Sequence, residues 1–162
     1  MIRDTARLLL FACLPLGALA SDGVARTEEG LAWREKSTQG LVSLAYGPAD
    51  QAKAPVFLLS CFNAMDIAVL DVRTKIAELA PGDALTIELS AGGATSPLSG
   101  EATRDHDGAT FGEASDIEVK PILDVLRQTG PLTVTIGANS ATLSDQGRAQ
   151  AVDSFSRNCD VD

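Results

Sequence analysis

The stretch LLSCFNAMDIAVLDV, residues 58–72, combines strand periodicity with a cysteine. Residues 56–62 form an apolar run with strand composition, and residues 66–72 alternate between apolar and other side chains. Both patterns are typical of β-strands, and the intervening Asn63-Ala64-Met65 fits a turn. The stretch therefore predicts a β-hairpin that carries Cys61 in its first strand.

The same pattern continues on both sides of this hairpin. Alternating or strand-like segments predict further strands over 41–46, 84–90, 97–104, 108–114 and 131–137. Asp107-Gly108 between two of them predicts a tight hairpin turn, because glycine readily adopts the positive φ that such a turn needs. Residues 21–40 are polar and have one landmark, Trp33.

The pattern changes to helical spacing in the C-terminal half. Residues 115–130 predict a helix with Pro121 in its first turn and Gly130 as its stop. Residues 143–159 predict a second helix, capped by Ser144, with Cys159 on its apolar face. The predicted fold class is therefore α+β, mainly antiparallel β-sheet or sandwich with two short helices.

The first twenty residues have the composition of a secretory signal peptide. A short basic start precedes an apolar run that ends at Ala18-Leu19-Ala20. A membrane anchor is the rival interpretation, but the run is too short to cross a bilayer. Lipid attachment at Cys13 is a second rival, disfavoured by the bulky Phe11. The expected organisation is a signal peptide over 1–20 and one β-rich periplasmic domain over 21–162.

Removal of the signal peptide leaves two cysteines, Cys61 and Cys159. An oxidising compartment favours a disulfide between them. Zinc binding would need more ligands, and the chain has one histidine, His106, and no paired-cysteine spacing. A catalytic thiol stays open by counting alone, although neither cysteine lies in a recognisable catalytic motif. We predict the disulfide, which would tie the last helix to the sheet.

The charge balance limits the classes of partner. The whole chain has 13 basic and 22 acidic side chains, and loss of residues 1–20 leaves 11 and 21, a net charge of −10. This charge disfavours nucleic acid and anionic lipid, and no later segment predicts a membrane span. It favours basic protein partners, although acidity also serves solubility alone.

Residues 103–116 contain the most suggestive polar constellation. Asp105, Asp107 and Gly108 imitate part of a calcium loop, but Thr103 and Ala114 stand where that loop needs carboxylates. We therefore predict no metal, no cofactor and no catalytic residue. Asp105, His106 and Asp107 are instead candidates for a binding surface, with Trp33 joining them if its ring is exposed rather than part of the core.

Several segments together resemble a group of small exported proteins of Gram-negative bacteria. An early Trp33 is followed by PVFLLSC (55–61), DIAVLDV (66–72), PILDVLRQTGPLTVTIG (121–137), LSDQGRAQAV (143–152) and FSRNC (155–159). This order is similar to that of periplasmic accessory proteins associated with type VI secretion, of the VasI/TagO type. The latter half is similar in layout to the invasion-associated locus B proteins. Ser60 stands where the group typically has an arginine.

The resemblance implies a non-enzymatic envelope protein with a β-rich fold and one disulfide. We therefore expect a periplasmic binding or accessory protein that acts through a protein–protein surface. The alternative is an acidic inhibitor or immunity-type protein directed against a basic envelope hydrolase. An enzyme is the third hypothesis, which a polar cleft with convergent carboxylates would favour.

Overall fold

The computed structural model describes residues 30–50, 52–74, 76 and 79–161. The predicted signal peptide and residues 21–29 lie outside this part. Nine strands and two helices follow in the order β1 (Leu31–Thr38), β2 (Leu41–Pro48), β3 (Phe57–Phe62), β4 (Ile67–Val72), β5 (Ala84–Ala91), β6 (Ala94–Arg104), β7 (Thr110–Ser115), α1 (Val119–Leu126), β8 (Leu132–Ile136), β9 (Asn139–Leu143) and α2 (Arg148–Asn158).

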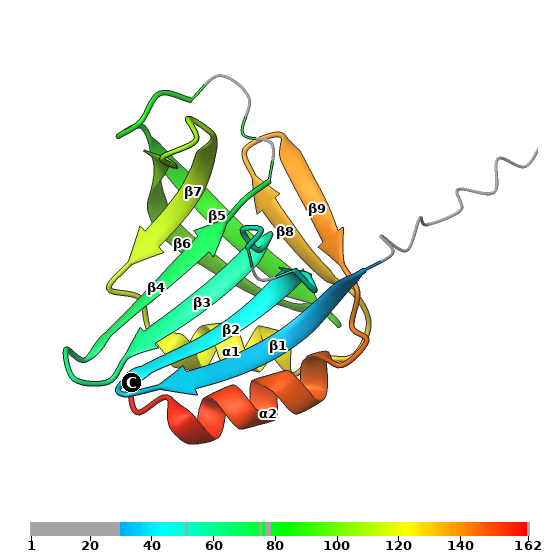
Figure 1. Cartoon of the computed structure of the whole chain (residues 1–162). Coiled ribbons are helices and arrows are strands. Elements are labelled where there is room, and N and C mark those ends of the chain that lie inside the picture. Colours follow the sequence, from blue (N-terminus) through cyan, green and yellow to red (C-terminus); the bar gives the residue numbers. More distant parts are fainter. Residues whose placement is uncertain (1–29, 51, 75, 77–78, 162) are drawn as a thin grey trace, which may run out of the picture.

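All nine strands belong to one curved antiparallel sheet. The strand order across it is β1-β2-β3-β4-β7-β6-β5-β8-β9, so β1 and β9 are its two edges. Figure 1 shows the sheet bending around the core, with α1 and α2 side by side at one end. The predicted α+β class, mainly antiparallel with two short helices in the C-terminal half, is confirmed.

The β3–β4 hairpin predicted from residues 58–72 is present at the centre of one half of the sheet. Leu59 pairs with Leu70 and Cys61 with Ala68, and all four side chains are fully buried. The neighbouring strand β2 alternates in the same way, so the inner face is apolar. Burial of this continuous face is the main favourable contribution to the stability of the fold.

Two edge strands and part of a third strand are absent from the sequence-based prediction. In β1 only Trp33 is buried, and in β9 only Leu143. An edge strand with one buried side chain has no alternating apolar pattern to detect. Strand β6 begins at Ala94 rather than at residue 97. Pro97 is tolerated there because β6 pairs with β7 only from Glu101 onward, leaving one side of Pro97 without a strand partner.

Gly100 allows β6 to approach β7 closely where β6 passes from pairing with β5 alone to pairing with both strands. A Cβ atom at this position would lie 2.3 Å from the carbonyl oxygen of Glu113. No other residue fits without moving one of the two strands. The bend lets β6 pair with β5 along most of its length and with β7 at its end.

Both helices are shorter than predicted. Helix α1 occupies eight residues within 115–130, with Pro121 in its first turn as expected. Helix α2 begins at Arg148, and the predicted cap at Ser144 is wrong. Gly147, at φ 78°, is the N-cap residue and makes no side-chain cap. The Ser144 side chain instead accepts a hydrogen bond from the Gln146 N–H at 3.1 Å.

Cys61 and Cys159 form the predicted disulfide, with an S–S distance of 2.05 Å. Cys159 is the C-cap residue of α2, in extended backbone and half-buried, rather than a member of the helix's apolar face. Asn63, in the β3–β4 turn, donates to the carbonyl of Asn158 and accepts from the N–H of Asp160. The chain end is therefore held to the sheet on both sides of the disulfide. None of the helices in the described residues has the length and apolar character that a bilayer crossing requires.

Candidate binding site at the loop end of the sheet

The end of the sheet opposite the helices is formed by loops. The β2–β3, β4–β5 and β6–β7 connections and the β8–β9 turn all lie at this end, because antiparallel strands alternate in direction. Figure 1 shows the β6–β7 and β8–β9 turns at the top of the view and the helices at the bottom. The predicted turn at residues 105–108 is part of this loop end.

A cleft of about 700 Å³ opens between the edge strand β9 and the far side of the curved sheet. We call it the edge cleft. One wall is the turn and strand over 138–143, and the other is formed by Tyr46, Val56, Arg73 and Thr74. The cleft therefore lies between the edge strand β9 and the loop-end residues of β2, β3 and β4.

Strand β9 has unpaired backbone groups along this cleft. The two-residue turn at 137–138 makes Ile136 and Asn139 a hydrogen-bonded pair. Hydrogen-bonded and non-hydrogen-bonded pairs alternate along an antiparallel ladder, so Ala141 also bonds to β8. The N–H and C=O groups of Ser140 and Thr142 then point away from β8, and no other strand in the described part of the chain pairs with β9.

Two aromatic side chains close the cleft at one end. The Trp33 indole N–H donates to the carbonyl of Ser144 at 2.5 Å, and the Ser144 N–H donates to the Tyr46 hydroxyl at 3.4 Å. The backbone groups of Ser144 point away from β8, like those of Ser140 and Thr142. At Ser144 both groups have hydrogen-bond partners, whereas those of Ser140 and Thr142 have none in the described part of the chain. Beyond Ser144 the edges separate and the cleft begins.

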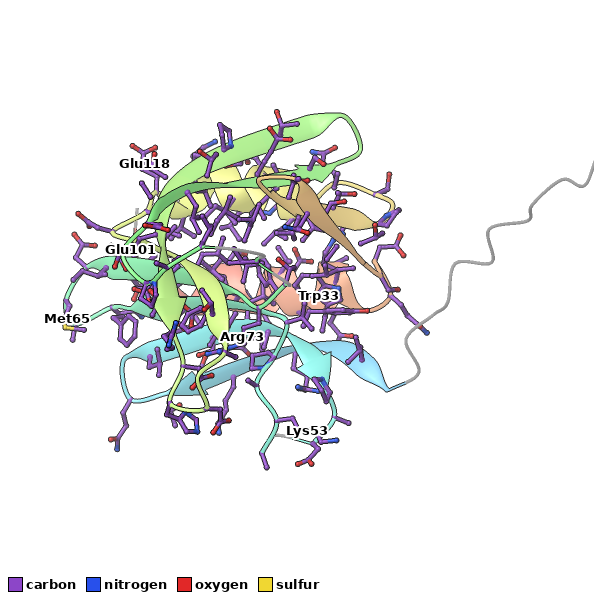
Figure 2. The ribbon with its side chains drawn as sticks, turned by 90° about the horizontal axis from the view of Figure 1, so that it is seen from above. Trp33, Lys53, Met65, Arg73, Glu101 and Glu118 are labelled. Carbon is purple, nitrogen blue, oxygen red and sulfur yellow. A yellow bond between two sulfur atoms is a disulfide. The ribbon has the colours of Figure 1, made fainter. Side chains whose placement is uncertain are left out.

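Trp33 is a core residue and not an exposed binding residue. Its side chain is 7% exposed and packs against Tyr46 and Phe57, with ring centroids 5.1 and 5.4 Å away. Figure 2 shows it inside the curve of the sheet. The sequence left open a core or a surface position for Trp33, and the structure places it behind the wall of the edge cleft.

Arg73 lies between the edge cleft and a smaller hollow beside the β6–β7 turn. Its guanidinium is 2.5 Å from the Asp105 carboxylate and stacks 4.1 Å above the Phe111 ring. The smaller hollow, about 360 Å³, is also lined by Asp105, Asp107 and Thr74. The Arg73 Nε and the Thr74 hydroxyl are buried and have no hydrogen-bond partner among the described residues.

The β6–β7 turn has the predicted geometry. Gly108 has φ 82°, and its N–H donates to the Asp105 carbonyl at 2.9 Å. Desolvation acts to raise the pKa of Asp105, but the His106 backbone N–H and the Arg73 charge together lower it. His106 also contacts both neighbouring carboxylates and is largely exposed. In the described ranges no three His, Cys, Asp or Glu side chains converge as a metal site.

Three carboxylates lie side by side on the outer face of neighbouring strands. Asp71 pairs with Glu113 across β4 and β7, and Glu113 pairs with Glu101 across β7 and β6. We call these residues the carboxylate row. Like charges directly opposite each other destabilise a sheet. Burial, and then the charges of Glu113 and Asp105, raise the pKa of Asp71 to about 6, although Arg73 lowers it.

Asp71→Asn is expected to stabilise the protein above pH 6. The folded state favours protonated Asp71, so its ionised form costs free energy that is fully present above about pH 6 and absent below the unfolded value of 3.8. Because the group is partly solvated, we expect a gain of about 1–2 kcal/mol at neutral pH. Urea denaturation at neutral pH and near pH 4 measures this gain. The difference in the free energy of unfolding between Asp71→Asn and the wild type should disappear near pH 4.

The exposed Asp153→Asn on α2 is the matched control for that substitution. It removes one negative charge far from the carboxylate row, and should leave the free energy of unfolding within about 0.5 kcal/mol at both pH values. An equal gain from both substitutions would assign the effect to net charge rather than to the environment of Asp71.

The sequence-predicted site residues fall into two groups. Asp105, His106 and Asp107 are together at the loop end, while Trp33 reaches that end only through Tyr46. Sequence reasoning missed Arg73, the edge of β9 and the carboxylate row. An arginine directly after an alternating strand was the one available signal for Arg73. The row depends on strand pairing, which the sequence does not display.

Comparison with known proteins identifies no relative. No family model, curated protein or solved structure matches the chain significantly. The resemblance to periplasmic accessory proteins therefore stays a prediction, and the functional argument rests on the geometry of the loop end.

Proposed function

We propose that this chain is an exported envelope protein that binds a protein partner through the loop end of its sheet and the adjoining carboxylate row on the outer face, without catalysing a reaction. The disulfide between Cys61 and Cys159 supports an oxidising compartment such as the periplasm. The partner is an envelope protein with a basic surface, and the binding or accessory role is the one that the sequence pattern favours.

The carboxylate row is the observation that carries this proposal. Three carboxylates at one level of three neighbouring strands cost stability. The pKa of Asp71 is raised, first by burial and then by the charge of Glu113. Residues that break a local rule of sheet stability are common at functional sites, where a partner compensates the cost. A basic surface placed over the row would relieve the repulsion and would be steered toward it over a distance of about 8–10 Å.

The expected result is loss of association rate when the row is neutralised. Affinity capture with the mature, disulfide-bonded protein from a periplasmic extract supplies the partner. Glu101→Gln combined with Glu113→Gln should then slow association by roughly two- to tenfold at low salt, with less effect on dissociation. Rising salt should reduce the difference between the wild type and the variant.

Asp124→Asn combined with Asp153→Asn is the matched control. These two exposed carboxylates lie on the helices, and the double variant has the same net charge as the row variant. If both double variants slow association equally, the effect comes from the total charge of the protein and not from the carboxylate row. Capture of nothing above background, or binding that ignores salt, would contradict the proposal.

The inhibitor hypothesis uses the same surface. A row of carboxylates fits the basic substrate cleft of an envelope hydrolase as well as it fits the surface of a secretion component. Hydrolase activity of the captured partner, measured with and without the wild-type protein, separates the two roles: loss of activity identifies an inhibitor, and unchanged activity an accessory protein.

A further inference from the structure

We infer that the edge cleft binds an extended segment of the partner polypeptide as an additional strand beside β9. The inference deepens the proposed function, since it names the mode of binding and the chemistry of the bound segment. It is carried by the backbone of β9, by the side chains that line the cleft and by the charge of Arg73.

The backbone of β9 specifies an extended polypeptide. Ser140 and Thr142 direct two N–H and two C=O groups into the cleft, at the spacing of an antiparallel or parallel ladder. Another extended main chain matches such a series of alternating donors and acceptors group by group, which is the basis of recognition by strand addition. At Ser144 the same groups already have partners in Trp33 and Tyr46, so the open positions begin immediately above a closed one.

The side chains of the cleft specify alternation in the bound segment. Ala141 and Leu143 of β9 face the core side, while Ser140 and Thr142 are exposed. A strand added beside β9 would direct every second side chain toward Ala141, Tyr46 and Val56, where apolar groups are favoured. The cleft volume of about 700 Å³ lies within the range of about 300–1,000 Å³ that is common for binding clefts.

Arg73 specifies the charge of the bound segment. Among the described residues that line the edge cleft it is the only charged one, in a chain whose net charge is −9. The Asp105 carboxylate pairs with one guanidinium nitrogen of Arg73. The Arg73 Nε and the Thr74 hydroxyl have no hydrogen-bond partner in the described ranges. One carboxylate on the segment complements this wall, whereas several would be repelled by the rest of the protein. The segment is therefore an apolar-alternating strand with a single acidic group.

The test uses a phage-displayed library of linear peptides selected on the disulfide-bonded protein. Enriched peptides should share apolar residues at every second position and one acidic residue. Thr142→Pro removes the outward N–H of β9 and leaves its pairing with β8 in place, since proline is compatible with the free side of an edge strand. We expect a synthetic copy of an enriched peptide to bind this variant roughly tenfold more weakly. Thr142→Val, which keeps the N–H, should bind the peptide as the wild type does.

Two further measurements keep the inference falsifiable if Thr142→Pro fails to fold. The amides of Ser140 and Thr142 should exchange faster in the free protein than that of Ala141, and should become protected when the peptide is bound. Replacing the acidic residue of the peptide with glutamine should weaken binding roughly two- to tenfold.

Three outcomes would overturn the inference. They are the absence of enriched peptides, equal affinity for Thr142→Pro and Thr142→Val, and unchanged exchange at Ser140 and Thr142. A captured envelope protein that depends on the carboxylate row but binds Thr142→Pro normally would overturn strand addition and leave the proposed function intact. Peptide binding at β9 without any captured partner would support strand addition and contradict the proposed function.

Discussion

Loss of the disulfide is expected to lower the free energy of unfolding by about 4–5 kcal/mol. The bond joins residues 98 positions apart, and closing a loop of that length lowers the conformational entropy of the unfolded chain. The loss is comparable with the whole stability of a small domain. Cys61 is fully buried, so Cys61→Ala is preferable to serine, which would bury a hydroxyl. Cys159→Ser is suitable at the half-buried C-cap.

Denaturant titration of the two single variants and the double variant measures this effect. Both single changes remove the same bond, so the double variant should be about as stable as either one rather than additively worse. Limited proteolysis should cut α2 faster in the variants, because only noncovalent contacts would then hold the chain end to the sheet. Wild-type protein that keeps its stability after reduction would contradict the prediction.

Replacing Arg148 is expected to lower the free energy of unfolding by about 3–5 kcal/mol. Its side chain is 1% exposed and donates to the carbonyls of Leu126, Gln128 and Gly130 at 3.0, 2.5 and 2.7 Å. Burial lowers the pKa of Arg148. The carbonyls at the C-terminal end of α1 stabilise the charge. Arg148→Met would leave three carbonyls without a donor, and each unsatisfied buried group costs about 1–3 kcal/mol.

Two further substitutions separate the causes of that loss. Arg148→Lys keeps the charge but not the planar fork that reaches several carbonyls, so its cost should be intermediate. Arg157→Ala, at an exposed position of the same helix, should change the free energy of unfolding by less than about 0.5 kcal/mol. Equal stability of Arg148→Met and the wild type would show that the three carbonyls are satisfied in another way.

The chain order of the elements and most of the central strands could be predicted from the sequence. Residues 58–72 form the β3–β4 hairpin, and Asp107-Gly108 forms a tight turn, because these features depend on local alternation and on local backbone preference. The disulfide was predicted from the number of cysteines, the expected compartment and the apolar setting of both residues in the sequence, without knowledge of their distance in space. Local rules were sufficient wherever a segment's neighbours along the chain determined its conformation.

The edge strands and the helix boundaries could not be predicted, because they depend on contacts that are distant in sequence. Strand β1 has one buried residue, Trp33, and its place is determined by the contacts of that ring with Tyr46 and with the carbonyl of Ser144. The same contacts occupy the backbone of Ser144, and Gly147 is instead the N-cap of α2. A hydroxyl in a favourable cap position does not act as a cap when the tertiary structure uses its residue elsewhere.

The sequence by itself determined an α+β chain with a buried β-hairpin, two helices and a pair of cysteines suited to a bond. Only the tertiary structure decided which polar groups meet. Asp71, Glu113 and Glu101 are 42 and 12 residues apart in sequence, yet strand pairing places them in one row. In the sequence Arg148 looks like an exposed residue at the start of a helix, whereas in the fold it is buried against the C-terminal end of α1. The physical reason is that pairing and packing bring together groups whose charges, desolvation and hydrogen bonds have no counterpart in local periodicity.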